Sequence, residues 1–392
     1  MFNPEVELNE ILMDAGVDFT ASLPCEKIKT LLEMIGDTFH HLPLTREEEG
    51  VGICAGAALS GKRPALFVQS TAIGNMLNAL LSLTQYYELP LALFISQRGI
   101  YKERIAAQLP MGQRLPAILK GAGIRYSVIG SATDFRDIGK QLAAVYKNNT
   151  VHAFLLSPAI WEGSAAIAKT KTDGKSRAKL MPYDNSRSAT QSQISKYTRY
   201  EILDIIAPYL RNKVVVCNLG IPCKELYAVL HQPSNFYMLG SMGMVTPIGL
   251  GISLTSGKEV VVIDGDGSIL MNPGTLATVA YSNPDNLTVV AIDNSVYGST
   301  GNQRTLTGAC VDLARVAMGF GIRNTIQAST KKELIAALRH LRERPNEHPD
   351  EYLGSGPRFI HALAVSGNSD APNIPLHHLD IRNNIRTFLA GK

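Results

Sequence analysis

Residues 260–268 read VVVIDGDGS, in which four apolar residues run directly into Asp-Gly-Asp-Gly-Ser. An uninterrupted apolar run of this length is typical of a strand that is covered on both faces, as in a parallel sheet. Glycine, aspartate and serine favour turns, so we expect the strand to end at Asp264. The polar residues that follow then lie at the carboxyl end of a parallel strand, where α/β proteins bind their ligands.

Similar apolar runs recur along the whole chain and alternate with helical patterns. In the first half they are Val17–Ala21, Leu42–Leu44, Ala65–Gln69, Leu91–Ser96, Tyr126–Ile129 and Ala153–Leu156. In the second half they are Val214–Asn218, Phe236–Leu239, Val260–Asp264, Leu287–Asp293, Thr325–Gln327 and Phe359–Val365. The alternation predicts an α/β protein with parallel sheets flanked by helices. Gly61-Lys62 and Gly257-Lys258 precede corresponding strands, which indicates a weak internal repeat.

The segment Ala165–Ser195 separates the two halves and is rich in Lys, Ser, Thr and Asp but poor in large apolar residues. This composition is typical of an exposed linker. We therefore predict one domain over 1–164, a linker over 165–195 and a second domain over 196–392, without a central third domain. Two similar domains in one chain favour a ligand site between them.

The composition is that of a globular protein, with 45% hydrophobic residues and a net charge of only +4 in 392 residues. A disordered chain is excluded, and the scattered positive charge argues against nucleic acid as a partner. The longest apolar runs fall far short of the roughly 20 residues that cross a bilayer, so no membrane association is expected. No signal peptide is visible, and the five cysteines are irregularly spaced. A cytoplasmic protein with reduced thiols is expected.

Asn294 follows Asp266 by 28 residues and ends the next apolar run, so both residues are predicted at the same edge of a sheet. Their side chains offer oxygen ligands suited to a divalent cation that bridges phosphates. The neighbouring glycines allow backbone N–H groups to approach a phosphate closely. Asp266 and Gly267 alone would equally fit a plain strand-to-helix turn, but Asn294 at this spacing favours the metal site.

This pattern resembles the thiamine diphosphate-dependent enzymes, whose signature is Gly-Asp-Gly, about thirty residues and then Asn. The resemblance implies Mg²⁺ bound by the Asp266 and Asn294 side chains and the Val296 carbonyl, and diphosphate bound by Gly265, Gly267 and Ser268. It also assigns the earlier loop Gly240-Ser241-Met242-Gly243 to the thiamine ring. Met242 would wedge the cofactor into its bent shape, although core packing is the commoner role of a methionine.

The same family requires a glutamate that contacts the aminopyrimidine ring, and Glu47, Glu48 and Glu49 are adjacent candidates. All three also suit the first turn of a helix capped by Thr45, with Glu48 completing a capping box. Related enzymes place a glycine nine residues after the catalytic glutamate. Counting back from Gly56 selects Glu47 as catalytic and leaves Glu48 as the cap.

Without a third domain, the chain resembles the shortened members of the family, above all the sulfopyruvate decarboxylase family, with phosphonopyruvate decarboxylases next. The matching segments span nearly the whole chain: Ser22–Cys25, Thr45–Ala57, Ser96–Gly99, Gly240–Gly243, Gly265–Ser268 and Asp293–Gln303. The resemblance implies decarboxylation of 3-sulfopyruvate to sulfoacetaldehyde, as in coenzyme M biosynthesis. It also implies a homodimer or higher even oligomer with the active site between subunits.

A sulfonated 2-oxo acid is a dianion, which arginine and amide side chains recognise well. The candidate substrate residues beside the matched motifs are Gln69, Asn75, Arg98 and Arg304. For each arginine, a solvated surface charge is an equally good interpretation. Arg304 stands where the phosphonopyruvate enzymes have proline, so it is a candidate for discriminating sulfonate from phosphonate.

Other functions fit less well. A 2-oxoacid:ferredoxin oxidoreductase would need a cysteine cluster, and a nicotinamide dehydrogenase would need a G-x-G-x-x-G turn after the first strand; the sequence has neither. An inactive scaffold subunit would not need both Glu47 and the metal motif. Phosphonopyruvate decarboxylation and ligation to a second aldehyde remain open alternatives within the same chemistry.

Overall fold

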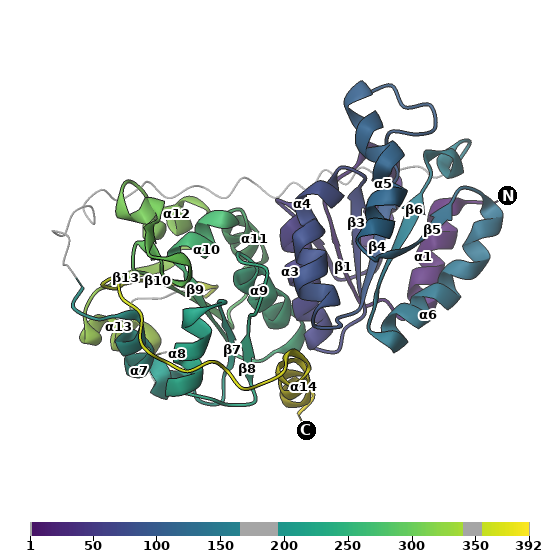
Figure 1. Ribbon diagram of the computed structural model, residues 1–392. Coiled ribbons are helices and arrows are strands. Elements are labelled where there is room, and N and C mark those ends of the chain that lie inside the picture. Colours follow the sequence, from purple (N-terminus) through teal and green to yellow (C-terminus); the bar gives the residue numbers. More distant parts are fainter. Residues whose placement is uncertain (1, 165–194, 340–354, 392) are drawn as a thin grey trace.

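The computed structural model describes residues 2–164, 195–339 and 355–391, and it contains two parallel sheets side by side (Figure 1). The first sheet has six strands in the order β2-β1-β3-β4-β6-β5. Their bounds are His41–Pro43 (β2), Phe19–Ser22 (β1), Pro64–Gln69 (β3), Leu91–Ser96 (β4), Val151–Leu156 (β6) and Arg125–Ile129 (β5). The central strand β4 is buried along its whole length, as its continuous apolar sequence predicts.

The second sheet also has six parallel strands, in the order β13-β14-β10-β9-β7-β8. Their bounds are Asn324–Ala328 (β13), Arg358–Leu363 (β14), Leu287–Asp293 (β10), Val260–Gly265 (β9), Val214–Cys217 (β7) and Asn235–Tyr237 (β8). Counted from β7 and without the short hairpin after β10, this order repeats that of the first sheet. The predicted strands, the fold class and the repeat are thereby confirmed.

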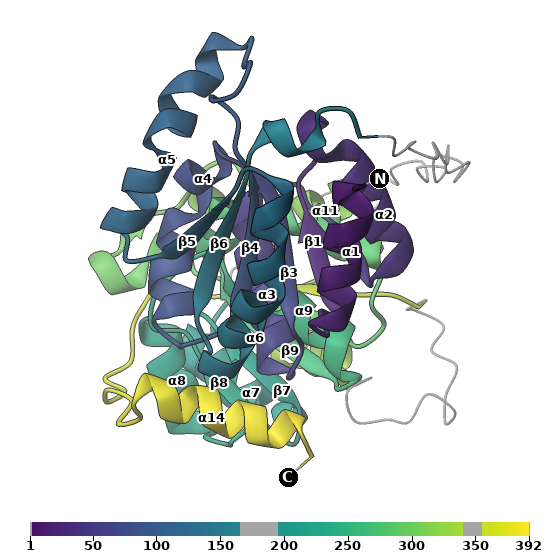
Figure 2. The same cartoon turned by 90° about the vertical axis from the view of Figure 1, so that its right-hand side faces the viewer.

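Helices cover both faces of each sheet (Figures 1 and 2). In the first half they are α1 (Pro4–Asp14), α2 (Lys29–Thr38), α3 (Glu47–Leu59), α4 (Ala72–Ala79), α5 (Leu109–Gly121) and α6 (Ile138–Asn148). In the second half they are α7 (Arg199–Leu210), α8 (Ile221–Val229), α9 (Val245–Ser256), α10 (Asp266–Met271), α11 (Thr275–Ser282), α12 (Leu313–Gly319), α13 (Lys331–Leu338) and α14 (His378–Leu389). Among the described residues, none of these helices is long and apolar enough to cross a membrane.

The predicted linker 165–195 lies, except for Ser195, outside the described residues. The limits of the two domains therefore stay a prediction. A hairpin of β11 (Val296–Tyr297) and β12 (Gln303–Arg304) follows β10 and was not expected from the sequence. Its two-residue strands are too short to produce a periodic pattern.

The two halves meet where α3 packs against α9, in the middle of the molecule (Figure 1). Glycines allow the two backbones to touch: a Cβ atom on Gly251 would lie 2.0 Å from the Ile53 carbonyl oxygen, and one on Gly56 would lie 2.2 Å from the Ile248 carbonyl oxygen. One continuous cluster of buried apolar side chains runs through this contact from one half to the other. The halves therefore share a core.

A second contact ties the C-terminal helix α14 to the first half, below the two sheets in Figure 2. Arg382 donates hydrogen bonds to the carbonyl oxygens of Tyr87 (3.2 Å) and Glu88 (3.1 Å). The Tyr87 hydroxyl in turn donates to the Tyr237 carbonyl (2.9 Å) and accepts from the Leu239 N–H (3.0 Å). These bonds hold the segment just before the Gly240–Gly243 loop against the first half.

We expect Gly251→Ala to lower the free energy of unfolding by about 3 kcal/mol, because its methyl group would collide with the α3 backbone. Gly139→Ala in α6 is the matched control, since the nearest atom to its Cβ lies 4.0 Å away. That substitution should be neutral or stabilising by up to about 1 kcal/mol, as alanine favours helix. Urea denaturation of both variants makes the comparison, and equal midpoints would contradict close backbone packing.

Candidate active site

A cleft opens at the carboxyl ends of β9 and β10, where the sequence places the candidate metal ligands. It encloses about 650 Å³, part of which is open solvent. Of the predicted cofactor and metal residues, seven line it: Met242, Gly265, Asp266, Gly267, Ser268, Asn294 and Val296. Gly240 and Ser241 lie beside it, in the same loop as Met242. The lining residues all belong to the second half of the chain.

Asp266 is the first residue of α10 and is buried. Its Oδ2 atom accepts hydrogen bonds from the hydroxyls of Thr305 and Thr307, the latter at 3.0 Å. Burial raises the pKa of this carboxyl group, and the nearby charge of Asp293 raises it further. A buried carboxylate of this kind gains from a bound cation, which would compensate its negative charge.

Asn294 and Val296 lie in contact at the start of the hairpin. With its side-chain amide turned by 180°, which gives both amide atoms a suitable partner, Asn294 donates to the Val296 carbonyl oxygen (2.9 Å) and accepts from Arg199 (3.2 Å). The described residues hold no group of three His, Cys, Asp or Glu that could bind a metal. A cation at this edge of the sheet would therefore depend on the mixed set of carboxylate, amide and carbonyl oxygens, which suits Mg²⁺.

The glycine of the Asp-Gly-Ser turn is required by its surroundings. A Cβ atom on Gly267 would lie 2.2 Å from the Tyr297 ring, so no larger residue fits there. The Ser268 hydroxyl accepts a hydrogen bond from the Gly243 N–H (3.1 Å), which joins the two candidate cofactor loops. Ser241 and Gly243 both have positive φ angles, 56° and 87°, so the loop turns tightly around Met242. These residues fit the diphosphate and ring of a thiamine cofactor.

Residues 220–349 match the family described as "Thiamine pyrophosphate enzyme, C-terminal TPP binding domain". The chain is 41% identical over 375 residues to the sulfopyruvate decarboxylase of Methanosarcina acetivorans, which covers 95% of this chain and 94% of that relative. The chain belongs to the sulfopyruvate decarboxylase family. It is thus a decarboxylase of the thiamine diphosphate-dependent enzymes.

Other relatives place the chain within this group. The phosphonopyruvate decarboxylase of Streptomyces viridochromogenes is 31% identical over 97% of this chain and 93% of its own length. In Methanococcus maripaludis, sulfopyruvate decarboxylase has separate subunits. The beta subunit is 40% identical and the match covers 47% of this chain and 94% of the subunit. The alpha subunit is 43% identical and the match covers 32% of this chain and 75% of the subunit. The solved benzoylformate decarboxylase of Polynucleobacter necessarius has the same fold, with a TM-score of 0.67 at 12% identity over 94% of this chain and all of that one.

The three adjacent glutamates, Glu47, Glu48 and Glu49, form the first turn of α3. Glu47 is buried, and its Oε2 atom accepts a hydrogen bond from Asn75 (3.0 Å). The predicted capping role of Glu48 is wrong, because Glu49 performs it: its Oε1 atom accepts from the Thr45 hydroxyl (2.8 Å) and from the Arg46 N–H (3.3 Å). The N-cap residue is Arg46 and not Thr45. Glu48 instead faces Arg46 at 3.6 Å.

Glu49 also reaches across to the second half. Its Oε1 atom accepts a hydrogen bond from the buried Thr278 hydroxyl (2.9 Å). The helix that carries Glu47 is thereby fixed to α11 as well as to α9.

The candidate substrate residues lie in two places. In the first half, Gln69 is the last residue of β3, Asn75 lies in α4 and Arg98 follows β4. Asn75 contacts Glu47 as described. Arg98 is buried, and its Nε and Nη2 atoms donate to both carboxylate oxygens of Glu103 (2.6 and 2.9 Å), which raises the pKa of Arg98. Arg304 is exposed on β12, directly opposite Val296 in the hairpin.

Several residues around the cleft were missed by the sequence analysis. Arg199 lines the cleft and forms a buried ion pair with Glu225, with an Nε to Oε2 distance of 2.6 Å. Thr305 and Thr307 bind Asp266 from beyond the hairpin. Arg199 and Glu225 are 26 positions apart, and Asp266 and Thr305 are 39 apart, so no local spacing links these partners.

We expect Glu49→Ala to lower the free energy of unfolding by about 2 kcal/mol. The substitution removes the helix cap and leaves the buried Thr278 hydroxyl without its carboxylate. Glu48→Ala is the matched control from the neighbouring position, and its effect should stay within about 0.5 kcal/mol. Chemical denaturation of both variants measures the difference. A larger loss for Glu48→Ala would restore the capping role to that residue.

Proposed function

We propose that the chain catalyses the non-oxidative decarboxylation of 3-sulfopyruvate to sulfoacetaldehyde and CO₂, using thiamine diphosphate and Mg²⁺. The reaction consumes one proton, which replaces the lost carboxylate at the carbonyl carbon. The main support is the family match over nearly the whole chain, together with the oxygen ligands gathered at the carboxyl ends of β9 and β10.

The residues of the cleft suit both groups. Asp266, Asn294 and the Val296 carbonyl would hold Mg²⁺, and Gly265, Gly267 and Ser268 would hold the diphosphate. Gly240, Ser241 and Met242 would contact the thiamine. When bound, thiamine diphosphate supplies a carbon nucleophile for the ketone and an electron sink for the departing CO₂.

Glu47 is proposed as the residue that exchanges a proton with the aminopyrimidine ring. Asn75 holds one of its carboxylate oxygens, so the other oxygen has a fixed direction. The helix N-terminus around Glu47 is immobilised by the Glu49 bonds, which keeps the carboxylate in one position.

The substrate carries a carboxylate and a sulfonate and therefore needs cationic partners. Arg98 already binds Glu103 through two of its nitrogens, whereas Arg304 forms no ion pair with the described residues. Arg304 is exposed at the hairpin that carries Val296, so we propose it as the sulfonate ligand, with Gln69 and Arg98 in supporting roles.

Phosphonopyruvate is the second candidate substrate, because a phosphonopyruvate decarboxylase is 31% identical over almost the full chain. A sulfonate and a phosphonate share tetrahedral geometry and differ in charge. The sulfopyruvate relative matches at 41% and therefore ranks first. The product aldehyde would then enter coenzyme M synthesis, in a cytoplasmic enzyme.

The purified protein should release CO₂ and an aldehyde from 3-sulfopyruvate when thiamine diphosphate and Mg²⁺ are supplied. We expect Glu47→Gln to lower kcat by about 100-fold or more, since it removes the proton-exchanging group. Pyruvate and 3-phosphonopyruvate are offered in parallel, and aldehyde trapping measures turnover. Turnover of phosphonopyruvate alone would identify that compound as the substrate in place of sulfopyruvate. Absence of turnover with all three 2-oxo acids would overturn the proposed reaction.

We also propose that the active site forms between two copies of the chain, in a homodimer or higher even oligomer. In the described residues the cleft is lined by the second half alone, whereas the candidate Glu47 belongs to the first half. A second copy could supply the missing wall. Relatives that consist of separate alpha and beta subunits support assembly from more than one chain.

Co-expression of two inactive variants tests this arrangement. In a mixed dimer of Glu47→Gln and Asp266→Ala chains, one of the two sites would contain both native residues. Random pairing should then restore about a quarter of wild-type turnover. Asp266→Ala with Asn294→Ala is the matched control, because both changes lie in the same half and no intact site can form. Absence of recovery in the first mixture would place both residues of a site in one chain.

A further inference from the structure

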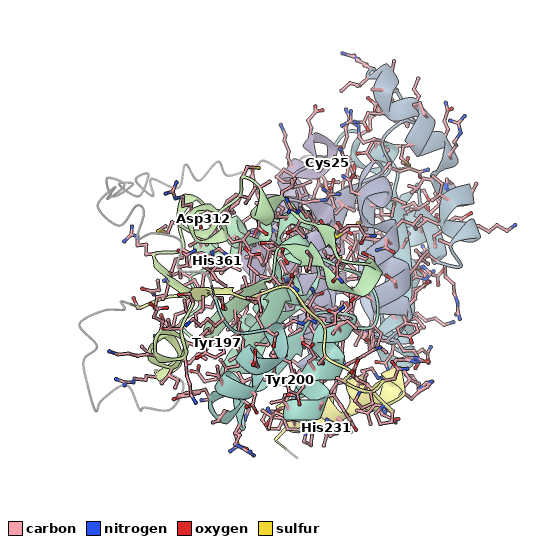
Figure 3. All side chains as sticks on the ribbon, turned by 60° about the vertical axis from the view of Figure 1, so that its left-hand side comes forward. Cys25, Tyr197, Tyr200, His231, Asp312 and His361 are labelled. Atoms are coloured by element: carbon pink, nitrogen blue, oxygen red, sulfur yellow. The ribbon has the colours of Figure 1, made fainter. Side chains whose placement is uncertain are left out.

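A buried histidine lies between two carboxylates behind the cleft. His361 on β14 is 2% exposed, and its Nε2 atom is 2.9 Å from Asp293 Oδ2. Its Nδ1 atom is 3.6 Å from Asp312 Oδ1, at the start of α12. Figure 3 shows Asp312 and His361 close together in the second half, away from the contact with the first half. Neither partner is near His361 in sequence, so the fold alone brings the three together.

The second carboxylate oxygen of Asp293 contacts residues that neighbour the proposed metal ligands. Asp293 Oδ1 accepts from the Ser295 N–H (3.0 Å) and lies 2.8 Å from the Thr307 hydroxyl. The same Thr307 hydroxyl lies 3.0 Å from Asp266 Oδ2. A continuous row of contacts therefore runs from His361 through Asp293 and Thr307 to Asp266. Through Ser295, it also fixes the backbone between Asn294 and Val296.

His361 and Asp293 shift each other's pKa in opposite directions. Burial alone would lower the pKa of His361, but the hydrogen bond to Asp293 and the neighbouring Asp312 carboxylate raise it. Burial would likewise raise the pKa of Asp293, but the His361 contact lowers it. The row therefore ties the buried Asp293 to His361 on one side and, through Thr307, to Asp266 on the other.

We propose that His361 is a positioning residue for the Mg²⁺ ligands. By holding Asp293, it sets the distance between Asp266 on one side and the Asn294 and Val296 oxygens on the other. Groups that orient metal ligands from behind typically change metal affinity by about 10- to 100-fold when they are removed. The inference rests on the proposed Mg²⁺ site, and it adds a residue that touches neither metal nor cofactor.

Calorimetric titration of thiamine diphosphate at a series of Mg²⁺ concentrations tests the role without any substrate. His361→Gln and Thr307→Val should each raise the Mg²⁺ concentration for half-maximal binding by roughly 10-fold or more. Thr307→Ser retains the hydroxyl and should bind like the wild type. His41→Gln is the matched control, because His41 also contacts two side chains, Thr20 and Ser22, but lies on β2 in the first half, whereas the cleft is lined by the second half.

Melting of the metal-free proteins separates positioning from stability. A merely structural histidine would lower the melting temperature in His361→Gln and in His41→Gln without changing the Mg²⁺ requirement of either. Wild-type Mg²⁺ dependence in a folded His361→Gln protein would therefore overturn the inference, whatever Thr307→Val shows. If His361→Gln does not fold, Thr307→Val decides alone. A wild-type chain that binds thiamine diphosphate without any need for Mg²⁺ would overturn the metal site itself.

Discussion

The contact of α3 with α9 is the constraint on which the rest of the structure depends. Here two helices approach until backbone touches backbone, and glycines at 56 and 251 leave no room for a side chain between them. Such a contact permits one register only, because a shift by a single residue would bring a Cβ atom against a carbonyl oxygen. The positions of Glu47 at one end of α3 and of the 240–243 loop before α9 follow from that register.

Most of the fold could be predicted because its strands are continuously apolar. Runs such as Leu91–Ser96 and Val260–Asp264 leave little choice other than a strand covered on both sides. The Asp266 and Asn294 spacing was informative for a related reason, since strand ends in a parallel sheet share an edge. The cleft accordingly gathers seven of the predicted residues.

The parts that could not be predicted depend on geometry without a local signal. Three consecutive glutamates offer the same chemistry, and only the direction of each side chain shows that Glu49 and not Glu48 caps the helix. Arg98 was a candidate for binding a dianion, yet Glu103, five residues later, holds two of its nitrogens. The pairs Arg199 with Glu225 and His361 with Asp293 join residues that are 26 and 68 positions apart.

The repeated strand order has a consequence for how the chain can be divided. Each half has a complete sheet, and no strand pairing in the described ranges joins the two. Cutting the backbone between residues 164 and 195 would thus leave both sheets intact. The two fragments would nonetheless associate through the apolar cluster that continues from α3 into α9, since each fragment alone would expose a large hydrophobic surface. Joining the two halves in one chain therefore fixes their stoichiometry, because each first half is made together with one second half.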